Sequence, residues 1–119
     1  MIISTCIDYR NMEENIEKIL FRLESDRNTD VDKVATNIVN ELTRLGLEAY
    51  PEEWEATAEL KDAYPDESKW EFSFWDDALV ECGTPQIRGD EHPWDWYRIS
   101  IMSVGCGGKE IYYVSYEID

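Results

Sequence analysis

One histidine and three cysteines are the side chains of this sequence best suited to nucleophilic or metal chemistry. His92 is the single histidine, and Cys6 and Cys106 are the cysteines that could pair with it as nucleophile and base. Cys6 falls in a predicted strand and Cys106 in a predicted turn, and no spacing brings either thiol to His92. The third cysteine, Cys82, forms no CxxC pair with the others. The sequence therefore predicts no catalytic residues, and His92 is expected to lie in an exposed loop.

The glycine-rich and acidic motifs likewise predict no catalytic or ligand-binding site. GCGGK, residues 105–109, lacks the GxxxxGK[ST] spacing of a phosphate-binding loop, and Glu110 would repel a phosphate there. Neither DESKWE nor the pair Asp76-Asp77 follows the order of acids in a calcium-binding loop. Carboxylate pairs for glycoside hydrolysis need a substrate cleft, which is not expected in so small a chain. We therefore expect no enzyme, no metal site and no cofactor.

Acidic residues are concentrated in the middle of the chain. The 119 residues carry a net charge of −16, and residues 48–95, with fifteen acids and three bases, contribute −12 of it. The five tryptophans lie inside this segment or directly after it. Like charges at this density repel one another and oppose folding. This cost favours the interpretation that the acidic segment forms a binding surface. The alternative is a solvated face that only keeps the protein in solution, or adaptation to a salty cytoplasm.

The spacing of such acids is compatible with imitation of nucleic acid. Carboxylates on one face of a strand lie about 6.5–7 Å apart, and helix neighbours about 5–6 Å apart. Phosphates along one DNA strand repeat at a comparable spacing. An array of this kind can occupy a cationic groove that otherwise holds phosphates.

The candidate partner-binding residues are acids of this segment and one tryptophan. In KWEFSFWDD, residues 69–77, alternation puts Trp70, Phe72 and Phe74 on an expected core face and Trp75 on the exposed face. An exposed indole among carboxylates is typical of a binding hot spot, whereas a loop or helix from residues 52–63 could instead cover it. The full set is Glu52, Glu53, Glu55, Glu59, Asp62, Asp66, Glu67, Glu71, Trp75, Asp76, Asp77, Asp90, Glu91 and Asp95.

Apolar residues at helical spacing predict two amphipathic helices near the N-terminus. The first follows an Asn11 cap, and the second runs from a Thr29 cap to Gly46, which suits the left-handed position after a helix. Pro51 can open a third, short helix.

Strands are expected before and after these helices. Residues 1–9 predict a first strand and residues 70–75 a second, and residues 78–82 are a candidate for another. Residues 94–104 and 109–118 predict a β-hairpin across GCGG. The predicted fold is α+β: an N-terminal strand, two amphipathic helices, then a mostly antiparallel sheet of about four strands ending in the hairpin, with the helices packed on one face.

Size and charge limit the class of protein. A chain of 119 residues, 43% hydrophobic, predicts one globular domain over residues 1–119. Its charge excludes attraction to nucleic acid or to an anionic membrane. No apolar run approaches the roughly 18 residues of a membrane span, and the N-terminus does not resemble a signal peptide. We expect a cytoplasmic protein with reduced cysteines, either a monomer or a homodimer.

Two functions fit this pattern best. The first is a stoichiometric inhibitor whose acidic face, at about residues 48–95, blocks the cationic site of a nucleic-acid-binding effector. The second is an immunity protein that neutralises a cognate basic toxin. In size, acidity and tryptophan content the chain is similar to small phage-borne inhibitors, including anti-CRISPR and DNA-mimic proteins, and to immunity proteins against bacterial nuclease toxins. A small enzyme or metal-binding regulator is a third hypothesis, which loss of activity in Cys106→Ser or His92→Ala would support.

Overall fold

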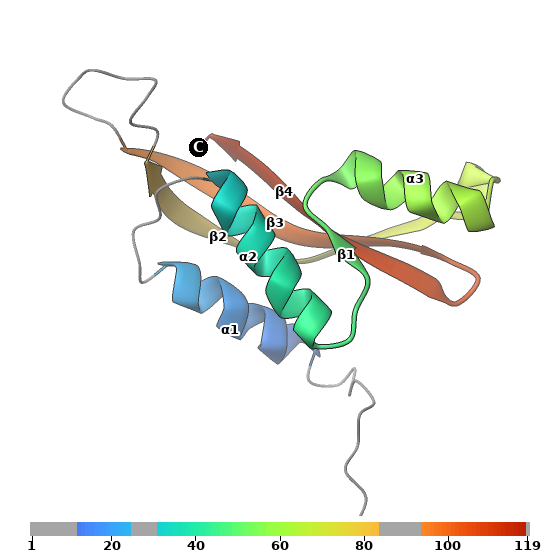
Figure 1. Ribbon diagram of the computed structural model, residues 1–119, viewed down its shortest axis with the longest axis horizontal. Helices are drawn as coiled ribbons and strands as arrows, with labels where there is room; N and C mark the ends of the chain where they lie inside the picture. The colour runs from blue at the N-terminus through green and yellow to red at the C-terminus, as the bar shows by residue number, and fades with distance from the viewer. Residues whose placement is uncertain (1–11, 25–30, 84–93, 119) are drawn as a thin grey trace, which may run out of the picture.

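The computed structural model describes residues 12–24, 31–83 and 94–118. These described residues form three α-helices, one 3-10 helix and four strands (Figure 1). In chain order these are α1 (Met12–Glu24), α2 (Val31–Arg44), β1 (Ala49–Tyr50), α3 (Glu53–Ala63), η2 (Glu67–Lys69), β2 (Glu71–Gly83), β3 (Trp94–Cys106) and β4 (Lys109–Ile118). The predicted N-terminal strand and the two predicted caps, Asn11 and Thr29, lie outside the described residues.

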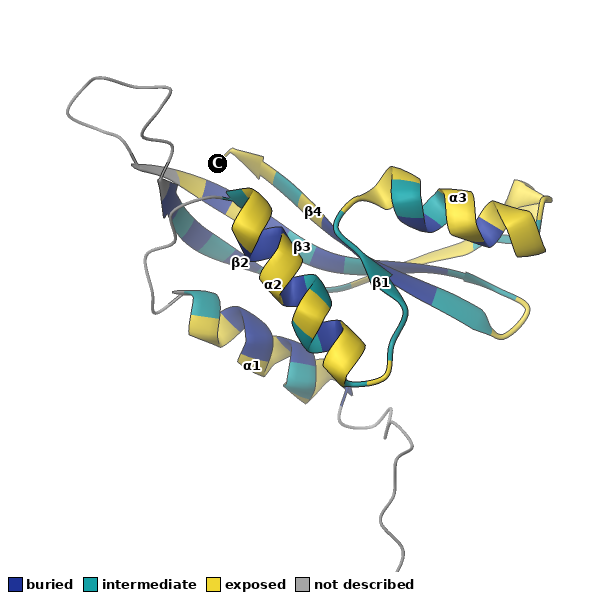
Figure 2. Ribbon diagram, in the orientation of Figure 1, coloured by how far each residue is buried: buried dark blue, intermediate teal, exposed yellow. Residues whose placement is uncertain are grey.

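Helices α1 and α2 form because each has an apolar stripe at helical spacing. Ile16 on α1 and Ile38 on α2 are fully buried, and the helices' outer faces are exposed (Figure 2). Gly46 ends α2 at a φ of 90°. The amide of Leu47 reaches the Leu42 carbonyl at 3.1 Å, and that of Gly46 reaches Thr43 at 2.9 Å. This is the left-handed glycine ending that the sequence predicts.

The four strands form one sheet in the order β1-β4-β3-β2. β2 with β3 and β3 with β4 are antiparallel, and the two-residue β1 is parallel to β4. The predicted hairpin is present, and its turn residues Gly107 and Gly108 have φ values of 59° and 86°. A side chain at Gly107 would also collide with Tyr64, whose hydroxyl donates to the Gly107 carbonyl at 3.0 Å. The α+β fold class is confirmed.

The helices cover different faces of this sheet. The main core is the buried cluster between α1, α2 and the sheet, and it includes Ile16, Ile38, Val80, Ile99, Ile101, Tyr112 and Val114. On β4, Tyr112 and Val114 belong to this main core, whereas Ile111 and Tyr113 pack with Leu60 of α3. Alternate residues of a strand point to opposite faces, so α3 packs on the face opposite α1 and α2. The smaller core under α3 consists of Ala56, Leu60, Val104, Ile111 and Tyr113. α3 therefore adds a second layer at the hairpin end of the sheet.

β2 differs from the prediction in length and in the direction of its side chains. It is one strand rather than two, and it has a bulge at Trp75, since Phe74 pairs with Met102 but Asp76 pairs with Ile101. Phe72 and Phe74, expected in the core, are 52% and 58% exposed. Trp70 is half-buried under the α3 side of the sheet. The predicted core face of residues 70–74 is thus wrong for both phenylalanines.

The bulge explains how two aspartates remain within a strand. A bulge adds one residue to a strand and changes its alternation, so Trp75 and Asp76 lie together opposite Ile101. The Asp76 carboxylate accepts a hydrogen bond from the Asp77 amide at 2.8 Å, and Asp77 pairs with Arg98 of β3 at 3.1 Å. These contacts satisfy polar groups at a place where the sequence indicates a break.

Candidate partner-binding surface

The predicted acids that lie together are those of α3 and η2. We call the exposed set the acidic surface, and it consists of Glu52, Glu53, Glu59, Asp62, Asp66 and Glu67. Helix α3 contains three of them, Glu53, Glu59 and Asp62, and Glu52 is its N-cap residue. Ala56 and Leu60, one turn apart, hold the opposite side of the helix against the sheet. Asp66 also fixes η2, since its carboxylate accepts from the Ser68 amide at 3.1 Å.

The charge of the acidic surface is only partly compensated. Residues 52–71 hold eight acids and two lysines, and Lys61 pairs with Glu67 at 3.0 Å. Glu53 and Glu55 lie in the first turn of α3, where the helix dipole favours them. The four acids Glu52, Glu53, Glu59 and Asp62 have no lysine or arginine partner within the described part of the chain. A cationic surface brought to this side would therefore meet available carboxylates.

The pKa values of two tyrosines near these acids are raised. Burial, the hydrogen bond from its hydroxyl to Glu48 at 2.9 Å and the charges of Glu48, Glu59 and Glu55 raise the pKa of Tyr50 to about 12. Burial and the nearby Glu53 raise the pKa of Tyr113 to about 12. Both shifts arise because a phenolate is disfavoured in a buried or negatively charged setting.

Other predicted acids lie apart from the acidic surface. Asp76 faces the side of the sheet covered by α1 and α2, and Asp77 is held by Arg98. Glu71 is exposed at the start of β2. Asp90 and Glu91 lie outside the described residues, and for Asp95 only the backbone position in β3 is described. The predicted set is therefore divided between the two faces of the sheet.

Trp75 is half-buried and packs against the main core, so its predicted exposure is wrong. Its indole Nε1 donates to Ser103 Oγ at 3.0 Å, and its ring centroid lies 5.7 Å from that of Tyr112. Ser103 Oγ in turn donates to Glu110 Oε2 at 2.8 Å. The predicted cover, a helix from residues 52–63, packs on the other face. The bulge turns Trp75 toward the α1–α2 side instead.

Three exposed aromatic residues next to the acidic surface were missed by the sequence prediction. Trp54 is 67% exposed on α3, and Phe72 and Phe74 project from β2 on the same side of the sheet. A groove of about 360 Å³ joins α3 to the start of β2, and its lining includes Glu53, Trp54, Lys61, Glu67, Trp70 and Phe72. The sequence feature that indicates this exposure is the pair Ala56 and Leu60. These two residues define the buried side of α3, and Trp54 lies on the exposed side.

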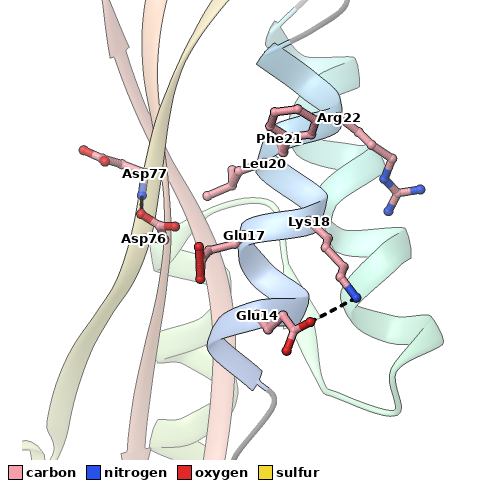
Figure 3. A pocket seen from close by; sticks show the side chains of 8 residues that line it. All are labelled: Glu14, Glu17, Lys18, Leu20, Phe21, Arg22, Asp76 and Asp77. Atoms are coloured by element: carbon pink, nitrogen blue, oxygen red, sulfur yellow. Dashed lines mark hydrogen bonds and ion pairs between the residues drawn. The ribbon is translucent and has the colours of Figure 1, made fainter.

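A second groove of about 620 Å³ lies between α1 and β2 (Figure 3). Leu20 and Phe21 give it an apolar wall, and Phe21 is 68% exposed. Its two cations are both engaged: Lys18 pairs with Glu14 at 3.3 Å, and Arg22 turns away from β2 to Glu41 of α2 at 3.0 Å. The carboxylates of Glu14, Glu17 and Asp76 make this groove acidic as well, whereas that of Asp77 points away from α1.

The residues considered for nucleophilic or metal chemistry lie only partly within the described residues. Cys82 is buried in the main core, Cys106 is half-buried at the hairpin turn, and Cys6 and His92 lie outside the described residues. No three His, Cys, Asp or Glu side chains of this described part are grouped to hold a metal ion. Lys109, at the end of GCGGK, pairs with Glu48 at 3.6 Å rather than facing an anion site.

The chain has no match among protein-family models, curated protein sequences or solved structures. Within the described residues, every helix is too short or too polar to cross a bilayer.

Proposed function

We propose that this protein is a stoichiometric inhibitor that binds a basic partner and occludes the site at which that partner holds nucleic acid. One observation carries the proposal: the exposed acids of α3 and η2, few of them paired, lie beside the exposed rings of Trp54 and Phe72. Carboxylates provide the attraction, and aromatic side chains provide the anchoring area typical of interface hot spots.

The mechanism is competition for cations. Arginine and lysine side chains that hold phosphates pair equally well with carboxylates through charge-assisted hydrogen bonds. The acids on α3 lie on a helix that packs on the sheet through Ala56 and Leu60, so binding has to order their side chains but not the backbone. The partner's groove is then filled by protein, and nucleic acid is excluded.

The test begins with capture of partners from a host lysate at low and high salt. Each captured protein is purified, and its binding to labelled nucleic acid is measured by fluorescence anisotropy as the wild-type protein is added. We expect nucleic-acid binding to disappear near equimolar protein. Undiminished nucleic-acid binding by a partner saturated with this protein would refute the proposal, and a captured nuclease toxin would favour the immunity-protein alternative.

A charge-matched pair of variants locates the effect. Glu59→Lys/Asp62→Lys changes the acidic surface, and Glu13→Lys/Glu117→Lys changes two exposed acids elsewhere. Each pair moves the net charge from −16 to −12. We expect the first pair to weaken inhibition by about tenfold or more and the second to change it far less. Equal effects would show that only total charge matters.

A further inference from the structure

The sheet face on the α3 side is only partly covered. α3 packs on the hairpin end of this face, over Ile111 and Tyr113. Beyond it, no other described element packs on the rows of β2 and β3 that contain Phe72, Phe74 and Trp96. We call these three residues, with the half-buried Met102 opposite Phe74 and the half-buried Leu79, the bare sheet face. The ion pair of Asp77 and Arg98 lies on the same face between Phe74 and Trp96.

Strand register places these residues on one side. Phe72 pairs with Val104 and Phe74 with Met102, and Val104 is buried under α3. Trp96 precedes Tyr97, which is buried in the main core, so Trp96 points to the opposite face. With Trp54 of α3, this side holds four of the six large hydrophobic residues exposed among the described ones. Exposed apolar side chains gathered in this way mark interaction sites.

The face is a better docking site than the neighbouring edge of β2. At the bulge, the Asp76 carboxylate already accepts the Asp77 amide hydrogen. Bulges and charged side chains are the usual means of preventing strand addition at an edge. The rings of Phe72 and Phe74, in contrast, have no such protection.

Charge decides what kind of occupant the bare sheet face accepts. A second copy would bring a net charge of −16 toward an identical one, and an anionic lipid or nucleic acid would also be repelled. Carboxylates border the rings. Glu53 lies in the groove with Phe72, as does Glu67, which pairs with Lys61 at 3.0 Å, and Asp77 lies in β2 beyond Phe74, where it pairs with Arg98 at 3.1 Å. These two pairs are on the surface, so an incoming cation can share their carboxylates. A cationic occupant is the complementary one.

We propose that the bare sheet face docks an arginine-bearing segment of the partner, with guanidinium groups stacked on Phe72 and Phe74 and paired with the bordering carboxylates. Arginine suits this surface better than lysine because its planar group stacks on aromatic rings and binds carboxylates through two parallel hydrogen bonds. The inference uses the proposed function only in taking the partner to be basic, and it adds the recognised side chain and the face.

The experiment compares an oligo-arginine with an oligo-lysine peptide of the same length, using isothermal titration of the full chain. We expect the wild type to bind oligo-arginine about tenfold more tightly, as stacking on two rings predicts. Phe72→Ala/Phe74→Ala should remove most of this preference and leave oligo-lysine binding unchanged. Phe21→Ala, which removes an exposed ring from α1, is the control and should retain the preference.

Two measurements keep the test decisive. Thermal unfolding shows whether Phe72→Ala/Phe74→Ala remains folded, and ring-proton shifts of Phe72 and Phe74 in the wild type report oligo-arginine binding without any substitution. Equal affinity for both peptides, unshifted ring protons, or an equal loss in Phe21→Ala would overturn the inference. Sedimentation that reveals a dimer lost in the double variant would assign the face to a second copy and also overturn it.

The outcome is separable from that of the proposed function. Arginine preference that depends on Phe72 and Phe74, found together with a captured partner whose nucleic-acid binding is unaffected, would support the docking site and refute nucleic-acid occlusion. Occlusion by a protein that treats both peptides alike would do the reverse.

Discussion

The two faces of the sheet are built from the same strands but are used differently. On the α1–α2 side, Ile99 and Ile101 of β3 are fully buried under two helices, and Trp75 is tied to Ser103. On the α3 side, Phe72, Phe74 and Trp96 are each at least half exposed. The first face contributes stability, because its apolar area is removed from water. The second leaves apolar area for a partner to bury.

The acidic residues follow the same division. On the main-core side, Glu110 accepts a hydrogen bond from Ser103. On the other side, most of the acidic residues of α3 are exposed. Substitutions on the two sides should therefore separate stability from binding.

The largest expected effect is in the main core. Ile38→Ala removes a fully buried side chain from α2 and should lower the free energy of unfolding by about 4 kcal/mol, because it leaves a cavity between helix and sheet. Urea denaturation measures it. Asn37→Ala, at an exposed neighbouring position, is the control and should change stability by less than about 0.5 kcal/mol. Equal losses would show that α2 does not anchor the core.

The sharpest comparison within β2 uses two adjacent aromatic residues. Trp75→Ala should cost about 3 kcal/mol of stability, since it deletes a half-buried ring and leaves Ser103 without its indole donor. Phe74→Ala should cost less than about 1 kcal/mol because its ring is largely in water. If Phe74→Ala proves the more damaging of the two, the assignment of faces on β2 is reversed.

High pH should weaken the packing of α3 on the sheet. The pKa of Tyr113 is raised from 10.0 to about 12 in the folded state, so its contribution is fully present below pH 10. As pH rises from 10 toward 12, the unfolded chain releases this proton while the folded protein retains it, and stability falls by about 2 kcal/mol. Urea denaturation at several pH values, with Tyr113→Phe as reference, isolates this loss. Identical pH profiles for the two proteins would contradict the burial of this hydroxyl under α3.

The smallest stability effect is expected on the acidic surface. Glu59→Lys/Asp62→Lys should leave the melting temperature unchanged or slightly raised, because it relieves repulsion and places a lysine in the last turn of α3, where the helix dipole favours it. A clear drop in melting temperature would mean that these acids hold the fold together and are not available for a partner.

Sequence patterns predicted the elements whose signals are local. The stripes of α1 and α2, the glycine after α2 and the glycine turn before β4 each depend on residues a few positions apart. The face of β2 could not be predicted in this way, because the bulge at Trp75 changes the alternation and is not encoded by an obvious residue type. The acidic segment was found from composition, but its division between two faces depends on that register. The exposure of Trp54 required knowing that α3 packs through Ala56 and Leu60.

The most direct test of the account is the association rate of the protein with its captured partner, measured by stopped flow between about 50 and 500 mM salt. If the acidic surface drives the encounter, the rate should fall by about tenfold or more over this range, since salt screens electrostatic steering. The slope should be flatter for Glu59→Lys/Asp62→Lys than for Glu13→Lys/Glu117→Lys, although both have the same net charge. A rate independent of salt, or equal slopes for the two variants, would contradict the claim that the acids of α3 recognise a basic partner.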